Sequence, residues 1–424
     1  MTLKRTSATN YGIDAKYLCP HAVKVVRTLL EAGFKAYLVG GCVRDMLLGL
    51  APKDFDVSTD ARPEDVITLF RRARIIGRRF KIVHVRFGRE VIEVTTFRGH
   101  HSEDHPHAVA SPTGQLLRDN VFGSLEEDAI RRDFTVNSLY YDLESNEVLD
   151  YTFGLQDIKD RKIRVIGDPE QRYREDPVRI IRAVRFAAKL NFEIEPDSAA
   201  PLHAMADMLG HVPAARLFDE ANKLLLSGYG EAVWFQLKKY HLLQQLFPLI
   251  NEALQQEQLL IQALINTDLR IREAKGINPA FFYSVLLWLP LQTRITAFLG
   301  DGLDITAASV KAAQEVISAQ LTVTSIPRRF TLAMREIWSM QHQLTRRSGQ
   351  RAAKNIQQPR FRAAYDFLLL REQCGEDTNG LGQWWTDYQE TDTEQRQKMV
   401  HALTPRSGRR NRYRSRKARN DVSH

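Results

Sequence analysis

The feature that most constrains the fold of this 424-residue chain is a change of hydrophobic pattern near residue 150. Before it, short apolar runs of strand length at 36–39, 55–57, 82–87 and 91–97 are interleaved with helical patterns at 21–32 and 42–48. After it, helical periodicity recurs at 176–190, 214–227, 231–247, 253–265, 308–320, 327–346 and 361–373, with no fixed repeat. The pattern predicts a small α/β head, with a mixed sheet and flanking helices, followed by a mainly α-helical neck and body.

Positive charge is concentrated at the end of the chain. The net charge is +9, and residues 405–419 contain seven arginines, one lysine and no acid, so the rest of the chain carries only +1. Such a block cannot bury apolar surface, and we expect it to be disordered when free. We expect it to bind nucleic acid, with an acidic membrane surface or a solubilising tail as alternatives. The basic residues are Arg406, Arg409, Arg410, Arg412, Arg414, Arg416, Lys417 and Arg419.

Apolar stretches and cysteines argue against a membrane or secreted protein. The longest nearly apolar stretch, 281–291, has 11 residues, whereas a transmembrane helix needs about 20. Three cysteines without CxxC spacing do not predict a disulfide framework, so we expect a reducing, cytoplasmic location.

Two carboxylates in Asp54-Phe55-Asp56 form the first candidate site. Residues i and i+2 of a strand point to the same face, so the acids would lie together while Phe55 and Val57 enter the core. Adjacent carboxylates repel each other, and hard oxygen ligands of this kind suit Mg²⁺. A DxD alone is weak evidence, because such pairs are also common in turns.

A glycine turn fourteen residues earlier strengthens this interpretation. Gly40-Gly41 follows a predicted strand, and the helix after it carries Arg44 and Asp45. Glycines allow close approach to a phosphate, and Arg44 on the first helical turn would reach the same anion. The alternative is an ordinary tight turn followed by surface residues.

A third carboxylate, Glu93, lies in the predicted strand Val91–Phe97, with Ile92 and Val94 facing the other side. It either faces solvent or points toward a site. Three carboxylates on adjacent strands could hold two metal ions for in-line phosphoryl chemistry.

Two further motifs carry groups that suit a nucleotide. In RRDFTVN, Arg132 can donate to phosphates, and Asp133 and Asn137 can bond ribose hydroxyls or form an i,i+4 pair with each other. In EDPVRIIRAVRF, Arg179, Arg182 and Arg185 recur every three residues. An arginine stripe is usually a solvated face, but its position after the other motifs favours a triphosphate or base contact.

The motifs GGCVRD, DFD, RRDFTVN and EDPVRIIRAVRF, in this order and spacing, resemble the class II nucleotidyltransferases, which comprise bacterial poly(A) polymerases and CCA-adding enzymes. They span about 40–190. The segment 75–85 (IIGRRFKIVHV), the late segment PRFRAAYD and the basic tail are similar to the polyadenylating branch. There, Arg78, Arg79 and Lys81 would add phosphate or RNA contacts.

The resemblance implies a role for each motif. Asp54 and Asp56 would hold Mg²⁺ in a two-metal site. Glu93 is the better third metal ligand on strand geometry, and Asp133 is the alternative third catalytic carboxylate. Asp176 with Arg179 would read the base edge. The implied ATP-binding residues are Gly40, Gly41, Arg44, Asp45, Arg132, Asp133, Asn137, Asp176, Arg179, Arg182 and Arg185.

The implied reaction is template-independent addition of AMP from ATP to RNA 3′ ends, which promotes RNA turnover. A hydroxyl deprotonated at the metal site would attack the α-phosphorus and release pyrophosphate. We expect a cytoplasmic monomer acting on mRNA, small RNA or tRNA-like ends beside the RNA-decay machinery, and peripheral membrane association through the tail stays open. The expected domains are a polar leader (1–20), the catalytic head (21–150), a nucleotide- and RNA-binding neck (151–225), an RNA-binding helical body (226–400) and the tail (401–424).

Three other functions remain open at this point. A CCA-adding enzyme would share every catalytic residue, so only the 75–85 segment and the tail argue against it. A non-catalytic RNA-binding adaptor would have no reason to keep clustered acids that repel each other. A small-molecule nucleotidyltransferase would not need the long helical body and basic tail.

Overall fold

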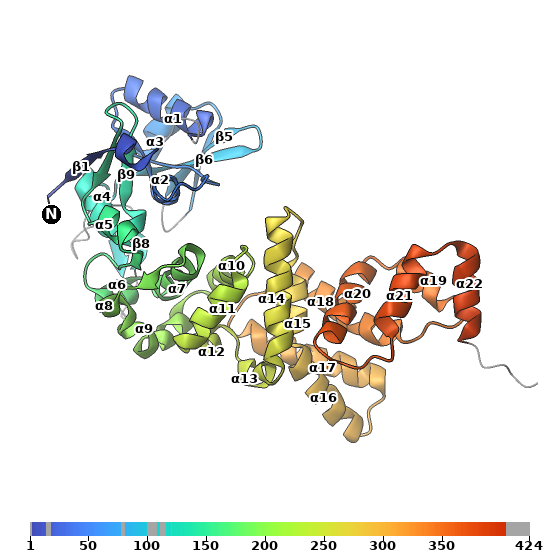
Figure 1. Cartoon of the computed structure of the whole chain (residues 1–424). Coiled ribbons are helices and arrows are strands. Elements are labelled where there is room, and N and C mark those ends of the chain that lie inside the picture. The colour runs from blue at the N-terminus through green and yellow to red at the C-terminus, as the bar shows by residue number, and fades with distance from the viewer. Residues whose placement is uncertain are drawn as a thin grey trace, which may run out of the picture. The chain divides into compact units, whose positions relative to one another are not determined.

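An eight-stranded mixed sheet forms the centre of the head in the computed structural model, with strand order β1-β10-β9-β2-β3-β6-β5-β4 (Figure 1). Neighbouring strands are antiparallel except for β3 and β6, which are parallel. The strands are β1 (Lys4–Ser7), β2 (Ala36–Val39), β3 (Asp56–Thr59), β4 (Ala73–Ile76), β5 (Ile82–Phe87), β6 (Glu90–Thr96), β9 (Leu139–Asp142) and β10 (Glu147–Asp150).

The structure describes residues 2–13, 18–77, 81–99, 108–110, 116–119 and 121–403. The chain divides into two units: Met1–Pro248 with Thr267–Lys275 and Gln320–Ser325, and Leu249–Asn266 with Gly276–Ala319 and Ile326–His424.

Helices α1 (Pro20–Glu31) and α3 (Pro63–Leu69) cover the sheet, α1 against β2 and β3 and α3 against β4 and β5. Their apolar faces and the inward side chains of the strands, such as Leu38, Val57 and Val94, form one core cluster. Burial of this cluster drives the head to fold, because apolar area removed from water contributes about 25 cal/mol per Å². Helix α2 (Gly41–Leu47) packs on β2 and β9.

Helices α4 (Leu125–Arg131), α5 (Gly154–Lys159), α6 (Pro169–Glu175) and α7 (Val178–Leu190) lead from the sheet into the helical part of the first unit. Helix α7 packs against α10 (Ala214–Leu225) and α11 (Gly230–Lys239), and its buried residues include Ile180, Ile181 and Val184. The other elements here are β11 (Lys162–Ile163), β12 (Glu193–Ile194), α8 (Pro196–Ala199), α9 (Pro201–Ala204) and α12 (Leu243–Leu246).

The second unit is helical throughout its described residues. One of its core clusters joins α18, α20 and α21 around the buried Trp385 and Phe361. Its helices include α13 (Ile250–Ala253), α15 (Pro279–Leu286), α16 (Trp288–Gly300), α18 (Arg328–Leu344), α19 (Arg351–Ile356), α20 (Phe361–Gln373), α21 (Leu381–Glu390) and α22 (Thr393–Ala402). Helices α14 (Glu257–Arg272) and α17 (Ile305–Leu321) contribute residues to both units.

The fold class predicted from the sequence is confirmed: a mixed sheet with flanking helices is followed by a mainly helical body. The strands expected at 36–39 and 82–87 have those bounds. The head also contains strands that the pattern did not predict. The edge strand β1 lies in the residues expected as a polar leader, and the paired strands β7 (Ala108–Ala110) and β8 (Leu116–Asp119) follow the predicted strand at 91–97. No described helix is long and apolar enough to cross a bilayer.

Candidate active site

The acidic pair lies where the chain enters β3. Phe55 and Val57 are 7% and 0% exposed, as the alternation predicted, and they anchor this segment in the core. Asp56 begins β3 and is half-buried, whereas Asp54 precedes the strand and is exposed. On the parallel neighbour β6, Glu93 is the register partner of Asp56. The structure therefore places Asp56 beside Glu93 at the start of β3, because paired strands lie about 4.8 Å apart, with Asp54 two residues earlier in the chain. The ligand atoms of the three acids do not all lie within 4.8 Å of one another, and we call this region the acidic edge.

The described residues neutralise the charge on these acids only in part. Burial, the charge of Glu93 and the charge of Asp54 raise the pKa of Asp56 to about 6, against the opposing effect of Arg132. Among the described residues, neither Asp54 nor Asp56 forms a side-chain ion pair or hydrogen bond. Glu93 Oε1 lies 3.2 Å from Nε2 of His84 on β5. A group of acids in this state favours a cation from outside the protein.

The glycine turn uses a backbone conformation that favours glycine. Gly40 has φ +79°, a region that side chains other than glycine's rarely occupy, and it joins β2 to α2. Arg44 is only 2% exposed. Its Nε lies 2.9 Å from Asp45 Oδ1, and one of its terminal nitrogens lies 2.5 Å from Asn137 Oδ1. Arg44 is therefore held in a fixed orientation below the turn.

Helix α4 delivers the RRDFTVN motif and starts with a capping box between Ser124 and Glu127. At its end, Asp128 accepts hydrogen bonds from Arg132 (3.1 Å) and Tyr140 (2.7 Å). Arg132 also donates to the Tyr140 hydroxyl, and its guanidinium stacks over that ring. These partners hold Arg132 close enough to Asp56 that its charge lowers the pKa of that acid.

Asp133 is fully engaged by protein groups. Its Oδ2 accepts from Arg182 Nε (2.8 Å) and a terminal nitrogen (2.5 Å), and its Oδ1 accepts from Phe134 N (2.8 Å) and Asn137 Nδ2 (3.2 Å). Burial alone would raise the pKa of Asp133, but Arg182 outweighs it and lowers the pKa to about 2. The Asp133–Asn137 contact is the i,i+4 pair that the sequence left open as an alternative.

The arginine stripe of α7 surrounds one aromatic ring. Phe186 lies 5.2 Å from the guanidinium of Arg182, 4.9 Å from that of Arg185 and 5.3 Å from that of Arg44. Burial and the neighbouring charge of Arg182 lower the pKa of Arg185 to about 10, and burial also lowers the pKa of Lys189. These cations are only partly neutralised, so the cluster favours an anion.

The start of the helical part holds a second set of pairs. Asp176 accepts two 2.8 Å bonds from Arg216 of α10, one on each carboxylate oxygen. Arg179 donates to Glu175 at 3.1 Å, and Glu175 also accepts from Arg172 at 2.5 Å. Asp176 and Arg179 are neighbours, as predicted, but each is oriented mainly by another residue.

Five residues of this site were missed at the sequence level. Lys189 continues the stripe one turn after Arg185 and could have been found by extending the periodicity. Arg216, Glu220 and His84 have no local signal, because their partners are distant in sequence. Phe186 resembles any core aromatic. Glu220 is buried and pairs with both Arg185 (3.5 Å) and Lys223 (2.9 Å).

Several predicted residues lie outside the described part of the chain or away from this site. Arg78, Arg79 and the basic residues of the tail fall outside the described residues. Lys81 is described, and its Nζ lies 3.3 Å from Glu64 Oε1 on α3.

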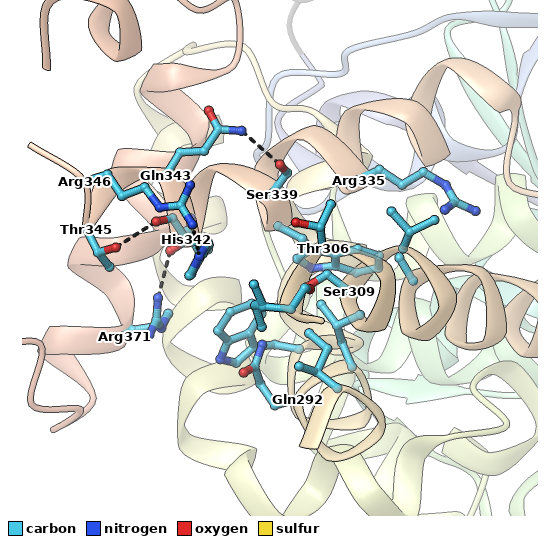
Figure 2. Close-up of a pocket in the computed structure, with 18 residues that line it drawn as sticks. Gln292, Thr306, Ser309, Arg335, Ser339, His342, Gln343, Thr345, Arg346 and Arg371 are labelled. Atoms are coloured by element: carbon cyan, nitrogen blue, oxygen red, sulfur yellow. Dashed lines mark hydrogen bonds between the residues drawn. The ribbon is translucent and has the colours of Figure 1, made fainter. Parts of the chain in front are cut away.

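The second unit has its own cavity of about 560 Å³, between α16, α17, α18 and α20 (Figure 2). Indole rings and cations share its wall: the Arg371 guanidinium lies 4.7 Å from the centre of the Trp288 ring, and Arg346 contacts His342. The other lining residues include Gln292, Thr306, Ser309, Arg335, Trp338, Ser339, Gln343 and Thr345.

Family models match three parts of the chain. Residues 36–164 match "Poly A polymerase head domain", residues 191–254 match "Probable RNA and SrmB- binding site of polymerase A", and residues 301–419 match "Polymerase A arginine-rich C-terminus".

Curated relatives agree with these matches. The chain is 46% identical to poly(A) polymerase I of Salmonella typhimurium over 405 residues, which cover 93% of this chain and 87% of that protein. It is 42% identical to poly(A) polymerase I of Haemophilus influenzae, covering 93% and 89%. A CCA-adding enzyme of Bacillus pumilus is 37% identical, but over only 55% of this chain and 57% of that enzyme.

Solved structures share the fold. A tRNA nucleotidyltransferase complexed with a primer tRNA and an incoming ATP analog is 24% identical, with a TM-score of 0.58 and coverage of 86% of this chain and 98% of that one. An apo tRNA-processing enzyme is 23% identical, with a TM-score of 0.59, covering 89% and 99%.

Proposed function

The chain belongs to the bacterial poly(A) polymerase family, and from this premise we propose how its residues hold and align the reactants. Members of this family are polynucleotide adenylyltransferases, which add AMP to RNA 3′ ends without a template. The proposal depends on one observation above all: among the described residues, Asp54 and Asp56 have no ion-pair partner, and the pKa of Asp56 is raised, whereas burial and the charge of Arg182 lower the pKa of Arg185 in the arginine cluster.

Asp54, Asp56 and Glu93 fit the magnesium ions that this chemistry requires. They offer hard oxygen ligands, and burial, together with the charges of Glu93 and Asp54, raises the pKa of Asp56, a shift that a bound cation would oppose. Bound there, Mg²⁺ would lower the pKa of the RNA 3′-hydroxyl and screen the charge of the α-phosphate. Asp133 is already bonded on both oxygens by Arg182, Phe134 and Asn137. We therefore assign Glu93 as the third metal ligand and Asp133 as a positioning residue.

The triphosphate is assigned to the cations on and beside α7. Burial lowers the pKa of Arg185 and of Lys189, and neighbouring arginine charges, including that of Arg44, lower these values further, so an anion beside them would stabilise their charged forms. Arg44 lies below the glycine turn and stacks on the same Phe186 ring. Held by Asp45 and Asn137, it presents fixed positive charge without having to reorganise when ATP binds.

The base is assigned to Asp176 and Arg179. Asp176 is held by a two-point bond from Arg216, which fixes the direction of its lone pairs. A carboxylate accepts a hydrogen bond from the exocyclic amine of adenine. Arg179, fixed by Glu175, offers donors to ring nitrogens. The pair would then act as a rigid protein template, with Arg216 as a positioning residue.

RNA is assigned to the second unit and the basic tail. The Figure 2 cavity combines indole rings with guanidinium groups, the combination that binds single-stranded nucleic acid by stacking and charge. The tail adds eight positive charges within residues 405–419. Each phosphate that they neutralise would release counterions and strengthen binding in a salt-dependent way.

Primer extension tests the activity directly. The protein is incubated with Mg²⁺ and each nucleotide singly, on a labelled generic RNA and on a tRNA ending in CC. We expect a long ladder on the generic RNA with ATP alone. A single A added to the tRNA, with no ladder on the generic RNA, would instead indicate CCA addition. A folded protein that extends neither RNA would indicate a non-catalytic RNA-binding adaptor.

Removing residues 405–424 tests the role of the tail. We expect weaker RNA binding with a shallower dependence on salt, because log Kd changes with log salt in proportion to about 0.7 per neutralised phosphate on single strands. Turnover on saturating primer should be retained. A deletion variant with an unchanged salt slope would show that the tail does not bind RNA.

A further inference from the structure

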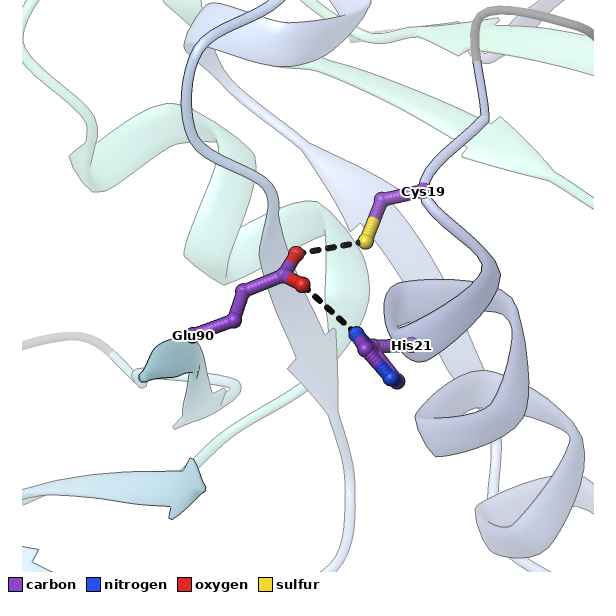
Figure 3. Close-up of side chains that lie close together, drawn as sticks. All are labelled: Cys19, His21 and Glu90. Atoms are coloured by element: carbon purple, nitrogen blue, oxygen red, sulfur yellow. Dashed lines mark hydrogen bonds and ion pairs between the residues drawn. The ribbon is translucent and has the colours of Figure 1, made fainter. Parts of the chain in front are cut away.

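A second group of metal-binding side chains lies in the head, outside the catalytic residues. Cys19 precedes α1, His21 lies in its first turn, and Glu90 begins β6 after the β5–β6 turn (Figure 3). Their ligand atoms all lie within 4.8 Å of one another, and no other such group is found among the described residues. Glu90 is 71 residues from Cys19 in sequence, so the tertiary fold brings the three together.

The three side chains point toward a common centre. Cys19 Sγ lies 2.8 Å from Glu90 Oε1, and His21 Nδ1 lies 2.6 Å from Glu90 Oε2. The His21 ring stacks on Phe87 at 4.5 Å between centres, with 15° between the planes. This stacking holds the imidazole ring with Nδ1 toward the Glu90 carboxylate, the orientation that His21 would need to share a metal ion with Glu90.

We propose that Cys19, His21 and Glu90 form a site for a zinc-type divalent cation, which fastens the start of α1 to the β5–β6 turn. The donor set of one sulfur, one nitrogen and one oxygen matches Zn²⁺ and other late first-row metals. It does not match Mg²⁺, which takes oxygen ligands. The site therefore differs in chemistry from the catalytic carboxylates.

Charge and geometry are consistent with this occupant. A thiolate, a carboxylate and a neutral imidazole balance one divalent ion. Zinc bonds of about 2.0–2.3 Å would separate the ligand atoms by about 3.3–3.5 Å. The two contacts of Glu90, now 2.8 and 2.6 Å, must therefore lengthen by less than about 1 Å, and the sulfur and nitrogen, which lie within 4.8 Å, must come to a similar separation. All three side chains are partly exposed, which leaves a fourth position for solvent. Binding releases the thiol proton and leaves the imidazole proton on Nε2.

The position of the site gives it a consequence for catalysis. Glu90 starts the strand that carries Glu93, whose register partner is Asp56. A cation that joins Glu90 to α1 would restrain the hairpin and hence the spacing of the catalytic carboxylates. The inference does not depend on the proposed nucleotide contacts, and its test does not use the enzyme's activity.

The test is a Co²⁺ titration of the full-length protein, stripped of metal and kept in excess Mg²⁺ so that the catalytic carboxylates are occupied. We expect one equivalent of Co²⁺ to bind and produce the thiolate-to-cobalt charge-transfer absorption. Zn²⁺ should abolish that absorption by displacement and raise the melting temperature. Removing a residue that only hydrogen-bonds to a metal ligand weakens metal binding by about 10–100-fold, and removing a ligand should weaken it at least as much. We therefore expect Cys19→Ser, His21→Gln and Glu90→Gln each to weaken Co²⁺ binding by at least about 10-fold.

Matched controls separate this site from the other thiols and acids. Cys374→Ser removes a partly buried free thiol of the second unit, and Glu31→Gln removes an exposed acid at the far end of α1. Both should bind Co²⁺ like the parent protein. No thiolate absorption in the parent, or equal absorption in Cys19→Ser, would overturn the proposal and leave the three residues as a hydrogen-bonded cluster.

Discussion

Asp56 in the acidic edge and Asp133 in the arginine network are both partly buried carboxyl groups, but their neighbours shift their pKa values in opposite directions. At the strand edge, burial and neighbouring acids raise the pKa of Asp56 to about 6. In the arginine network, Arg182 lowers the pKa of Asp133 to about 2 although that side chain is also buried. We propose that the first group, the acidic edge, receives a cation, whereas Asp133 is already bonded to Arg182 and Asn137. The difference indicates which acids bind an external ion and which hold other residues in place.

The largest effect should follow from breaking the first group. Asp54→Ala removes an exposed carboxylate that nothing in the described part of the chain requires for packing. We expect AMP addition to fall by at least about 10³-fold, the scale seen when a group at the reacting atoms is lost. The measurement is single-turnover primer extension, with circular dichroism as the control for folding. A folded Asp54→Ala variant with parental activity would show that the acidic edge is not the catalytic centre.

A smaller effect should follow from removing one arginine from the cluster around Phe186. Arg185→Gln removes one partly neutralised charge beside Phe186 and leaves the metal ligands intact. We expect KM for ATP to rise by about 10–100-fold, with a smaller change in kcat, because a charge-assisted bond to phosphate is worth about 1.5–3 kcal/mol. Steady-state kinetics with varied ATP measure this. The matched control is Arg174→Gln on α6, an exposed arginine paired only with Glu170 at 3.3 Å. An unchanged KM in Arg185→Gln would place the triphosphate elsewhere.

The smallest effect should come from replacing Arg216, the residue that orients Asp176. Arg216→Gln leaves Asp176 without its two-point partner but removes no group assigned to ATP. We expect preference for ATP over CTP to fall by about 10-fold, since a freely rotating carboxylate no longer presents fixed lone pairs. Competition assays with both nucleotides measure the ratio. An unchanged ratio, together with parental stability, would remove Asp176 from base selection.

The sequence was informative where function depends on local pattern. Alternation predicted that Phe55 and Val57 would be buried, and both are. The same period-2 pattern predicted the strand of Glu93, and the parallel pairing of β3 and β6 brings Glu93 level with Asp56. The helical patterns of the body also hold, because an amphipathic face of 3.6-residue period has few other ways to be buried.

What the sequence could not supply is the choice of partners. Asp133 pairs with Arg182 across 49 residues, and Asp176 with Arg216 across 40. Such pairs are set by how α7 and α10 pack, and any of several arginines would have satisfied the pattern. The sequence predicted Arg44 as an anion contact on the first helical turn, with a surface residue as the alternative, and gave no sign that it would be buried. It is buried because Asp45 and Asn137 offset the cost of removing its charge from water.

The central claim is that folding raises the pKa of Asp56 and lowers the pKa of Asp133. The most direct measurement compares the thermal stability of Asp56→Asn and Asp133→Asn with that of the parent protein. A carboxyl group whose pKa is raised by folding destabilises the protein when the pH lies above its folded-state pKa. Asp56→Asn should therefore stabilise the metal-free protein by about 1–3 kcal/mol at about pH 8. That gain should disappear below about pH 4. A lowered pKa contributes stability above the unfolded value, so Asp133→Asn should destabilise by about 2–4 kcal/mol at about pH 8. Two variants that shift stability in the same direction would contradict the account.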